Sequence, residues 1–122
     1  MPSRIVERNH HGRCAMIDGL WLLQWSIEGT ERSGVIVVNE GRALGGNAGF
    51  ICTGMLSATG ENVIGQLHIR QVNQALPPIL PGLTDYRLRI VGMLHGDRID
   101  IAGDIPDRPE LTVRIRATRH AV

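Results

Sequence analysis

Few side chains of this 122-residue sequence have the spacing of catalytic or metal-binding groups. His10, His11 and Cys14 offer three zinc ligands, but structural zinc needs four and no second cysteine–histidine pair complements them. An unstructured arm over residues 1–15 is therefore the better interpretation of this segment. Four aspartates form the other candidate cluster: Asp97, Asp100, Asp104 and Asp107. Their spacing distributes them over a turn, a strand and a loop, and no serine or histidine completes a triad. We therefore expect no enzyme, no metal and no cofactor.

Arginines at alternating positions form a further candidate site. Every basic residue of the chain is arginine, whose planar guanidinium can form two parallel hydrogen bonds with a carboxylate or a phosphate. The alternating set is His68, Arg70, Arg87, Arg89, Arg114 and Arg116. Two hypotheses remain open: a basic patch that binds an acidic partner, or a solvated face offset by acids such as Asp100. The net charge of +1 argues against direct nucleic-acid binding. We predict that Arg87, Arg89, Arg114 and Arg116 contact a protein partner.

Composition is that of one globular domain, which we place at residues 16–122, with 43% apolar and 20% charged residues. Only two cysteines occur, Cys14 and Cys52, and the N-terminus has no signal-peptide core. These features predict a protein of the reducing cytoplasm. The apolar runs are too short to span a bilayer, which needs about 20 residues. Met16, directly before the first structured run, is a candidate start codon.

From Asp18 onward the pattern is that of β-strands separated by short glycine-containing turns. We predict strands at 19–27, 33–39, 42–45, 48–56, 62–73, 84–95, 98–103 and 110–118. Short connections make neighbours in sequence antiparallel neighbours in space. Because closure removes the two exposed edges of such a meander, the predicted fold is all-β, an eight-stranded antiparallel up-and-down barrel. An open sandwich is the alternative.

The two halves of the predicted barrel differ in their alternation. In the second half apolar and charged residues alternate, so that one face meets the core and the other meets water. In the first half both faces of the strands are apolar, a pattern typical of strands covered on both sides. No amphipathic helix is available as a cover, which favours a homodimer. The predicted dimer contacts are Leu20, Leu22, Ile36 and Val38.

The segment 74–83, QALPPILPGL, combines three prolines with four large apolar residues. Proline excludes helix and paired strand, and an ordinary surface loop would avoid the apolar residues. The segment is predicted to plug one mouth of the barrel or to form a lid over a ligand cavity. The alternative function is accordingly that of a carrier for a small lipophilic ligand inside the barrel. Trp21 and Trp25 would fill much of that interior if they point inward.

Several short motifs, in this order and spacing, give the chain a family resemblance. They are Asp18-Gly19-Leu20-Trp21, Gly34-Val35-Ile36-Val37-Val38, Gly41-Arg42-x-Leu44-Gly45-Gly46-Asn47, Gly54, Pro78-Ile79-Leu80 and Asp85-Tyr86-Arg87-Leu88. Through them the chain resembles the GrlR-like negative regulators of bacterial type III secretion. The resemblance covers everything except the first fifteen residues.

The resemblance implies a small lipocalin-like β-barrel that dimerises and sequesters a transcriptional activator of secretion genes. It also implies an activator-binding acidic loop in the hairpin that follows the strand at Gly49–Leu56. Here that hairpin, residues 57–62, carries Glu61 as its only acid. We predict Thr59, Glu61 and Asn62 as partner-binding residues, with a contact that differs from the family's acidic one.

Overall fold

The computed structural model describes residues 16–27, 29–78, 80 and 82–122. The predicted arm, with His10, His11 and Cys14, lies outside these residues. The described chain forms eight strands: β1 (Gly19–Ile27), β2 (Thr30–Asn39), β3 (Arg42–Gly46), β4 (Phe50–Thr59), β5 (Asn62–Gln71), β6 (Asp85–His95), β7 (Arg98–Ile105) and β8 (Arg108–Ala121). No helix in this part of the chain is long and apolar enough to cross a membrane.

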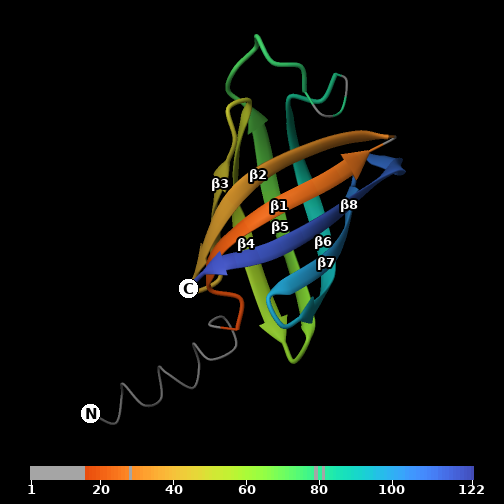
Figure 1. Cartoon of the computed structure of the whole chain (residues 1–122). Helices are drawn as coiled ribbons and strands as arrows, with labels where there is room; N and C mark the ends of the chain where they lie inside the picture. Colours follow the sequence, from red (N-terminus) through yellow and green to blue (C-terminus); the bar gives the residue numbers. More distant parts are fainter. Residues whose placement is uncertain (1–15, 28, 79, 81) are drawn as a thin grey trace.

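The strands close into a barrel in which each pairs with its neighbours in sequence and β8 returns to β1 (Figure 1). All eight pairings are antiparallel. The predicted up-and-down barrel is therefore confirmed, and the open sandwich is not formed. Differences are confined to strand ends: β2 begins earlier than predicted, at Thr30, and β8 extends beyond residue 118 to Ala121.

The barrel interior is filled by apolar side chains that alternate along each strand. Trp21 is 1% exposed and Trp25 is 7% exposed, so both tryptophans belong to the core. The inward faces predicted for the second half are also confirmed, since Leu88 and Ile90 on β6 and Val113 on β8 are buried. No polar or charged residue among those described is buried in this core. Two small voids remain inside it, of about 30 and 10 Å³.

On strand β2 the side chains of Ile36 and Val38 point into the barrel. A dimer contact through these residues would need them to point outward. These two side chains are core residues, 3% and 2% exposed, whereas Val35 and Val37 are 46% and 49% exposed. The assignment of Ile36 and Val38 to an outer surface is therefore corrected. A strand that is apolar on both faces carries no alternation from which its inward side could be predicted.

Outward apolar side chains continue from β2 across the neighbouring strands and form an outer apolar face. Its members are Val35, Val37, Leu44, Met55, Ile64, Val91 and Met93. Val37 lies opposite Leu44 in the β2–β3 register, and Ile64 lies opposite Val91 in the β5–β6 register. Leu20 on β1 is also outward, at 37% exposure, and Leu22 is half-buried.

The glycine pair Gly45-Gly46 ends β3 where the chain turns tightly into β4. A Cβ on Gly45 would lie 1.9 Å from the carbonyl oxygen of Val35, so the close approach of β3 to β2 requires glycine. Gly46 has a φ of +148°, which glycine adopts readily. The Asn47 side chain then stabilises the turn, because its Oδ1 accepts hydrogen bonds from the backbone N–H groups of Gly49 (2.7 Å) and Phe50 (3.2 Å).

The proline-rich connection between β5 and β6 closes over one end of the barrel (Figure 1). Leu80 is 3% exposed and belongs to the core, and Leu83 packs against that core. The Gln71 Nε2 atom donates a hydrogen bond to the Leu76 carbonyl oxygen over 2.8 Å, which fixes the start of the connection. Leu80 thus acts as the predicted plug.

Candidate protein-binding surfaces

The β4–β5 hairpin presents Thr59, Glu61 and Asn62 to solvent, as a partner-binding loop would. Thr59 and Asn62 face each other as the last paired residues of the two strands. The Glu61 carbonyl oxygen accepts a hydrogen bond from the Leu94 N–H over 2.7 Å, which anchors the turn to β6. The hairpin lies at the end of the barrel opposite the proline-rich connection (Figure 1). It is therefore exposed and anchored, with one carboxylate.

The four predicted partner-binding arginines all point outward, but they differ in their ion pairs. Arg89 donates from Nε to Asp104 over 3.1 Å, and Arg116 lies 3.7 Å from Asp100. Within the described part of the chain, no carboxylate lies at ion-pair distance from Arg87 or Arg114. The basic face is thus partly offset by acids, and Arg87 and Arg114 keep their donors for other partners.

Two of these arginines line an open groove of about 740 Å³ that runs across β7, β8, β1 and β2. Arg114 and Arg116 lie along it beside the polar side chains of Gln24 and Ser26, their register partners on β1. Asp100 and Glu31 add two acids to its wall. Charged groups of both signs and hydrogen-bonding side chains thus line this groove.

Three of the four aspartates that resembled a carboxylate cluster form ion pairs with arginines, and Asp100 lies near two of them. Asp97 pairs with Arg119 over 2.9 Å, Asp104 pairs with Arg89, and Asp100 lies 3.2 Å from Arg98. No group of three or more potential metal ligands occurs among the described residues.

The two titratable groups that face the core have strongly raised pKa values. Burial raises the pKa of the Cys52 thiol to about 12. Burial, and secondarily the neighbouring Cys52, raises the pKa of Tyr86 to about 12. Both groups are therefore neutral at physiological pH, and Cys52 lacks the thiolate that a nucleophile needs.

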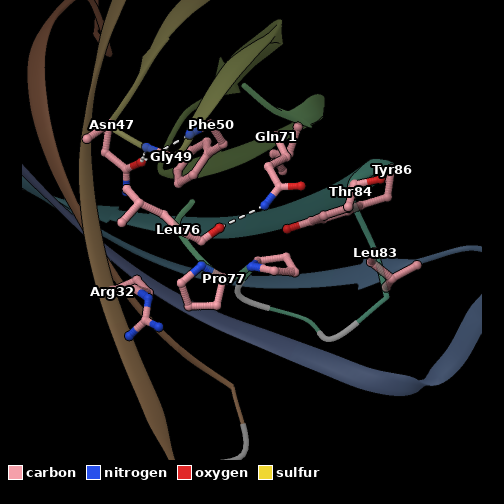
Figure 2. Close-up of a pocket in the computed structure, with 13 residues that line it drawn as sticks. Arg32, Asn47, Gly49, Phe50, Gln71, Leu76, Pro77, Leu83, Thr84 and Tyr86 are labelled. Carbon is pink, nitrogen blue, oxygen red and sulfur yellow. Dashed lines mark hydrogen bonds between the residues drawn. The ribbon is translucent and has the colours of Figure 1, made fainter. Parts of the chain in front are cut away.

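A cavity of about 300 Å³ lies under the proline-rich connection at the barrel mouth (Figure 2). Phe50, Leu76, Pro77 and Tyr86 contribute to its wall, with Arg32 at its edge. The sequence analysis did not single out Arg32. Continuing the inward alternation of β2 backward from Ile36 through Gly34 would have placed Arg32 on the inward side, at the mouth.

Comparison with known protein families identifies the family of this barrel. A family model described as "T3SS negative regulator, GrlR" matches residues 16–121. The chain belongs to the GrlR family of type III secretion negative regulators. The predicted resemblance is thereby confirmed, and membership in GrlR implies a negative regulatory role in type III secretion. A family of regulators also points to protein binding rather than catalysis. A search of curated proteins gives no match to the chain.

Proposed function

We propose that this GrlR family member represses type III secretion by binding and sequestering a transcriptional regulator of secretion genes. In this proposal it acts in the cytoplasm as a homodimer and contacts DNA only through its partner. The observation that carries the proposal is the family match over residues 16–121, which coincides with the described barrel.

The filled interior of the barrel supports protein binding over the carrier alternative. Its two internal voids, of about 30 and 10 Å³, are one to two orders of magnitude smaller than typical small-molecule pockets (roughly 300–1,000 Å³). A lipophile inside the barrel would have to displace core side chains such as Trp21 and Leu88. The chemistry available to a partner therefore lies on the outside.

The partner surface in this proposal is the groove at Arg114 and Arg116, extended by Arg87 and Arg89 on β6. Arg87 and Arg114 offer guanidinium donors that are not committed to an acid of the described chain, and such donors suit an acidic segment of a partner. The β4–β5 hairpin, with Glu61 alone, is a second contact. A basic contact would differ in sign from the family's acidic loop.

The homodimer in this proposal uses the outer apolar face, with Leu20 and Leu22 of β1 at its margin. A face of this kind is complementary to itself, and an isologous pair would remove both copies of it from water. Val35 and Val37 replace Ile36 and Val38 as the β2 contacts.

Transcription in the native host tests the proposed function. Overproduction of the protein is expected to lower transcripts of the secretion genes several-fold, and the same regulator should co-purify with it. The double variant Arg114→Glu/Arg116→Glu should lose both effects, because it reverses charge on the groove. Arg108→Glu, a charge reversal on β8 outside both the groove and the outer apolar face, is the matched control and should keep both. Unchanged transcripts with the wild-type protein would refute the proposal. Replacement of residues 58–62 tests the hairpin separately.

A further inference from the structure

The cavity at the barrel mouth is apolar on most of its wall, with Arg32, Asn47, Gln71 and Thr84 as polar lining residues (Figure 2). Its apolar wall comes from Phe50, Ile69, Leu76, Pro77, Pro78 and Leu83. Its volume of about 300 Å³ is at the lower end of the range for small-molecule pockets (about 300–1,000 Å³). We propose that this cavity binds a small amphipathic carboxylate, with the apolar body inside and the carboxylate held by Arg32. This ligand site goes beyond the proposed regulator binding, although Arg32 also lines the groove at Arg114 and Arg116.

Arg32 supplies the charge recognition in this site. It lies opposite Trp25 in the β1–β2 register, two residues before the buried Gly34, and so belongs to the inward-facing row of β2. Its guanidinium donates one hydrogen bond, to the Glu31 carbonyl oxygen over 3.1 Å. No acid of the described chain pairs with it, and no aspartate or glutamate lines the cavity. An unpaired guanidinium beside an apolar hollow favours a carboxylate over a neutral ligand.

The indole of Trp25 gives an independent indication of a missing ligand or water. Its Nε1 atom is buried without a hydrogen-bond partner, although buried donors are normally paired. Trp25 packs edge-on against Phe50, with ring centroids 5.2 Å apart. It lines the internal void of about 30 Å³, which shares Phe50, Ile69 and Tyr86 with the mouth cavity. A ligand in the mouth would therefore contact the same rings that surround the unpaired N–H.

The walls of the cavity are fixed in place before any ligand binds. The Val72 N–H donates to the Gly49 carbonyl oxygen over 2.9 Å, which ties the proline-rich connection to the β3–β4 turn. Gln71 holds Leu76 through its side-chain amide, over 2.8 Å. A pre-formed site loses less conformational entropy on binding than a flexible one.

Titration of the ¹⁵N-labelled full chain with octanoate and with 2-naphthoate tests the site by NMR. The readout is the pair of indole N–H cross-peaks, with Trp21 as the internal control. Trp21 donates to the Ile17 carbonyl oxygen over 2.8 Å, deep in the core. Either acid is expected to shift the Trp25 cross-peak saturably and to leave the Trp21 cross-peak in place. The neutral counterparts 1-octanol and 2-naphthalenemethanol should bind about tenfold more weakly. Comparison of the two acids shows whether the body is alkyl or aromatic.

Three variants assign the effect to the cavity. Arg32→Gln should remove the preference for the acids over the alcohols. Arg87→Gln, an outward arginine equally without an acid partner in the described chain, should keep it. Gly49→Leu should abolish binding, because a Cβ at Gly49 fits at 3.4–3.6 Å from its neighbours and points toward Leu76, so that a longer side chain enters the hollow. An unmoved Trp21 cross-peak verifies folding of each variant.

The proposal is overturned if neither acid shifts the Trp25 cross-peak up to its solubility limit. It is equally overturned if the preference for acids survives Arg32→Gln, or if binding survives Gly49→Leu. These readouts involve no partner protein, so their failure is distinguishable from failure of the proposed regulator binding.

Discussion

Arg119 joins three separate segments at the end of the barrel that carries the β4–β5 hairpin. Its Nε donates to the Asp97 carboxylate over 2.9 Å, and its Nη1 donates to the carbonyl oxygens of Met16 (2.9 Å) and Asp18 (3.0 Å). The guanidinium also lies 4.8 Å from the centroid of the Trp21 ring. Its side chain is 15% exposed, so these contacts are only weakly screened by solvent. One residue thus connects the start of the described chain, a turn and the core.

Arg119→Ala is expected to lower the free energy of unfolding by about 2 kcal/mol, because it removes the cation–π contact and leaves two carbonyl oxygens without a donor. Urea denaturation followed by tryptophan fluorescence measures the change. Arg114→Ala, on the solvent face of β8, should change stability by less than about 0.5 kcal/mol. Equal losses in the two variants would contradict the role given to Arg119.

The raised pKa of Cys52, about 12, gives stability a defined pH dependence. In the unfolded chain a cysteine ionises near pH 8.5, so above that pH the unfolded state releases a proton that the folded state keeps. The contribution of Cys52 to the free energy of unfolding should therefore be constant below about pH 8 and should fall above pH 9, by up to about 1.4 kcal/mol per pH unit. Tyr86, whose pKa is also about 12, adds to the fall above pH 10.

Urea denaturation between pH 7 and pH 10.5, in a Cys14→Ser background, measures this dependence. Adding Cys52→Ala should make the fall between pH 9 and pH 10 shallower, whatever the change in absolute stability. If the free energy of unfolding falls equally steeply with pH in the presence and absence of Cys52, burial of this thiol does not contribute to the pH dependence of stability.

At the scale of elements, the short strand β3 approaches β2 so closely that it requires glycine at position 45. Gly45 lies opposite Ile36 in the register, and a Cβ there would also come within 2.6 Å of the Ile36 Cα. The obstacle is the backbone of the paired strand, which cannot move without separating β2 from β3. At Gly49, four residues later, a Cβ would make only ordinary van der Waals contacts.

Gly45→Ala should therefore destabilise the barrel by about 3 kcal/mol, an overpacking effect. Gly49→Ala is the matched control from the same turn, with its nearest neighbours at 3.4–3.6 Å, and should change stability by less than about 1 kcal/mol. Thermal unfolding of the two variants beside the wild-type protein gives the comparison. A stable Gly45→Ala barrel would mean that β2 and β3 can separate without loss of pairing.

At the scale of the whole molecule, the outer apolar face predicts that the protein forms a homodimer. Met55 is 57% exposed and Val91 is 63% exposed, and Val91 lies opposite the outward Ile64. Exposed apolar side chains gathered on neighbouring strands are typical of an interface. The other half of the barrel wall, around β7 and β8, carries charged side chains and has no such face.

Light scattering at micromolar concentration should accordingly give twice the chain mass of 13.4 kDa. Val37→Glu or Met55→Glu should reduce it to a monomer, because a dimer would bury the new charge. Thr112→Glu on the outward face of β8 should leave the dimer intact. A monomeric wild-type protein, or dimers in all three variants, would exclude this interface.

The alternation of apolar and polar residues made the barrel predictable from the sequence. Where this alternation is absent, the inward side of a strand could not be predicted. On β6 and β8, arginines between apolar residues identified the inward side directly. On β2 the run Val35-Ile36-Val37-Val38 is apolar on both sides, so only the structure separates core from surface there. Arg119 was missed because the predicted last strand ended at residue 118. The mouth cavity was anticipated only as one of two roles for the proline-rich segment, because its shape depends on how distant strands meet.

Closure of the barrel between its first and last strands has a consequence for synthesis of the protein. Leu20 pairs with Ala121, and Arg119 contacts Asp18 across 101 residues of sequence. During synthesis, the edge of β1 that pairs with β8 therefore stays unpaired until β8 has left the ribosome. A nascent or truncated chain exposes the free edges of β1 and β7, which are templates for aggregation. Folding of the barrel is thus expected to be complete only after β8 has been synthesised.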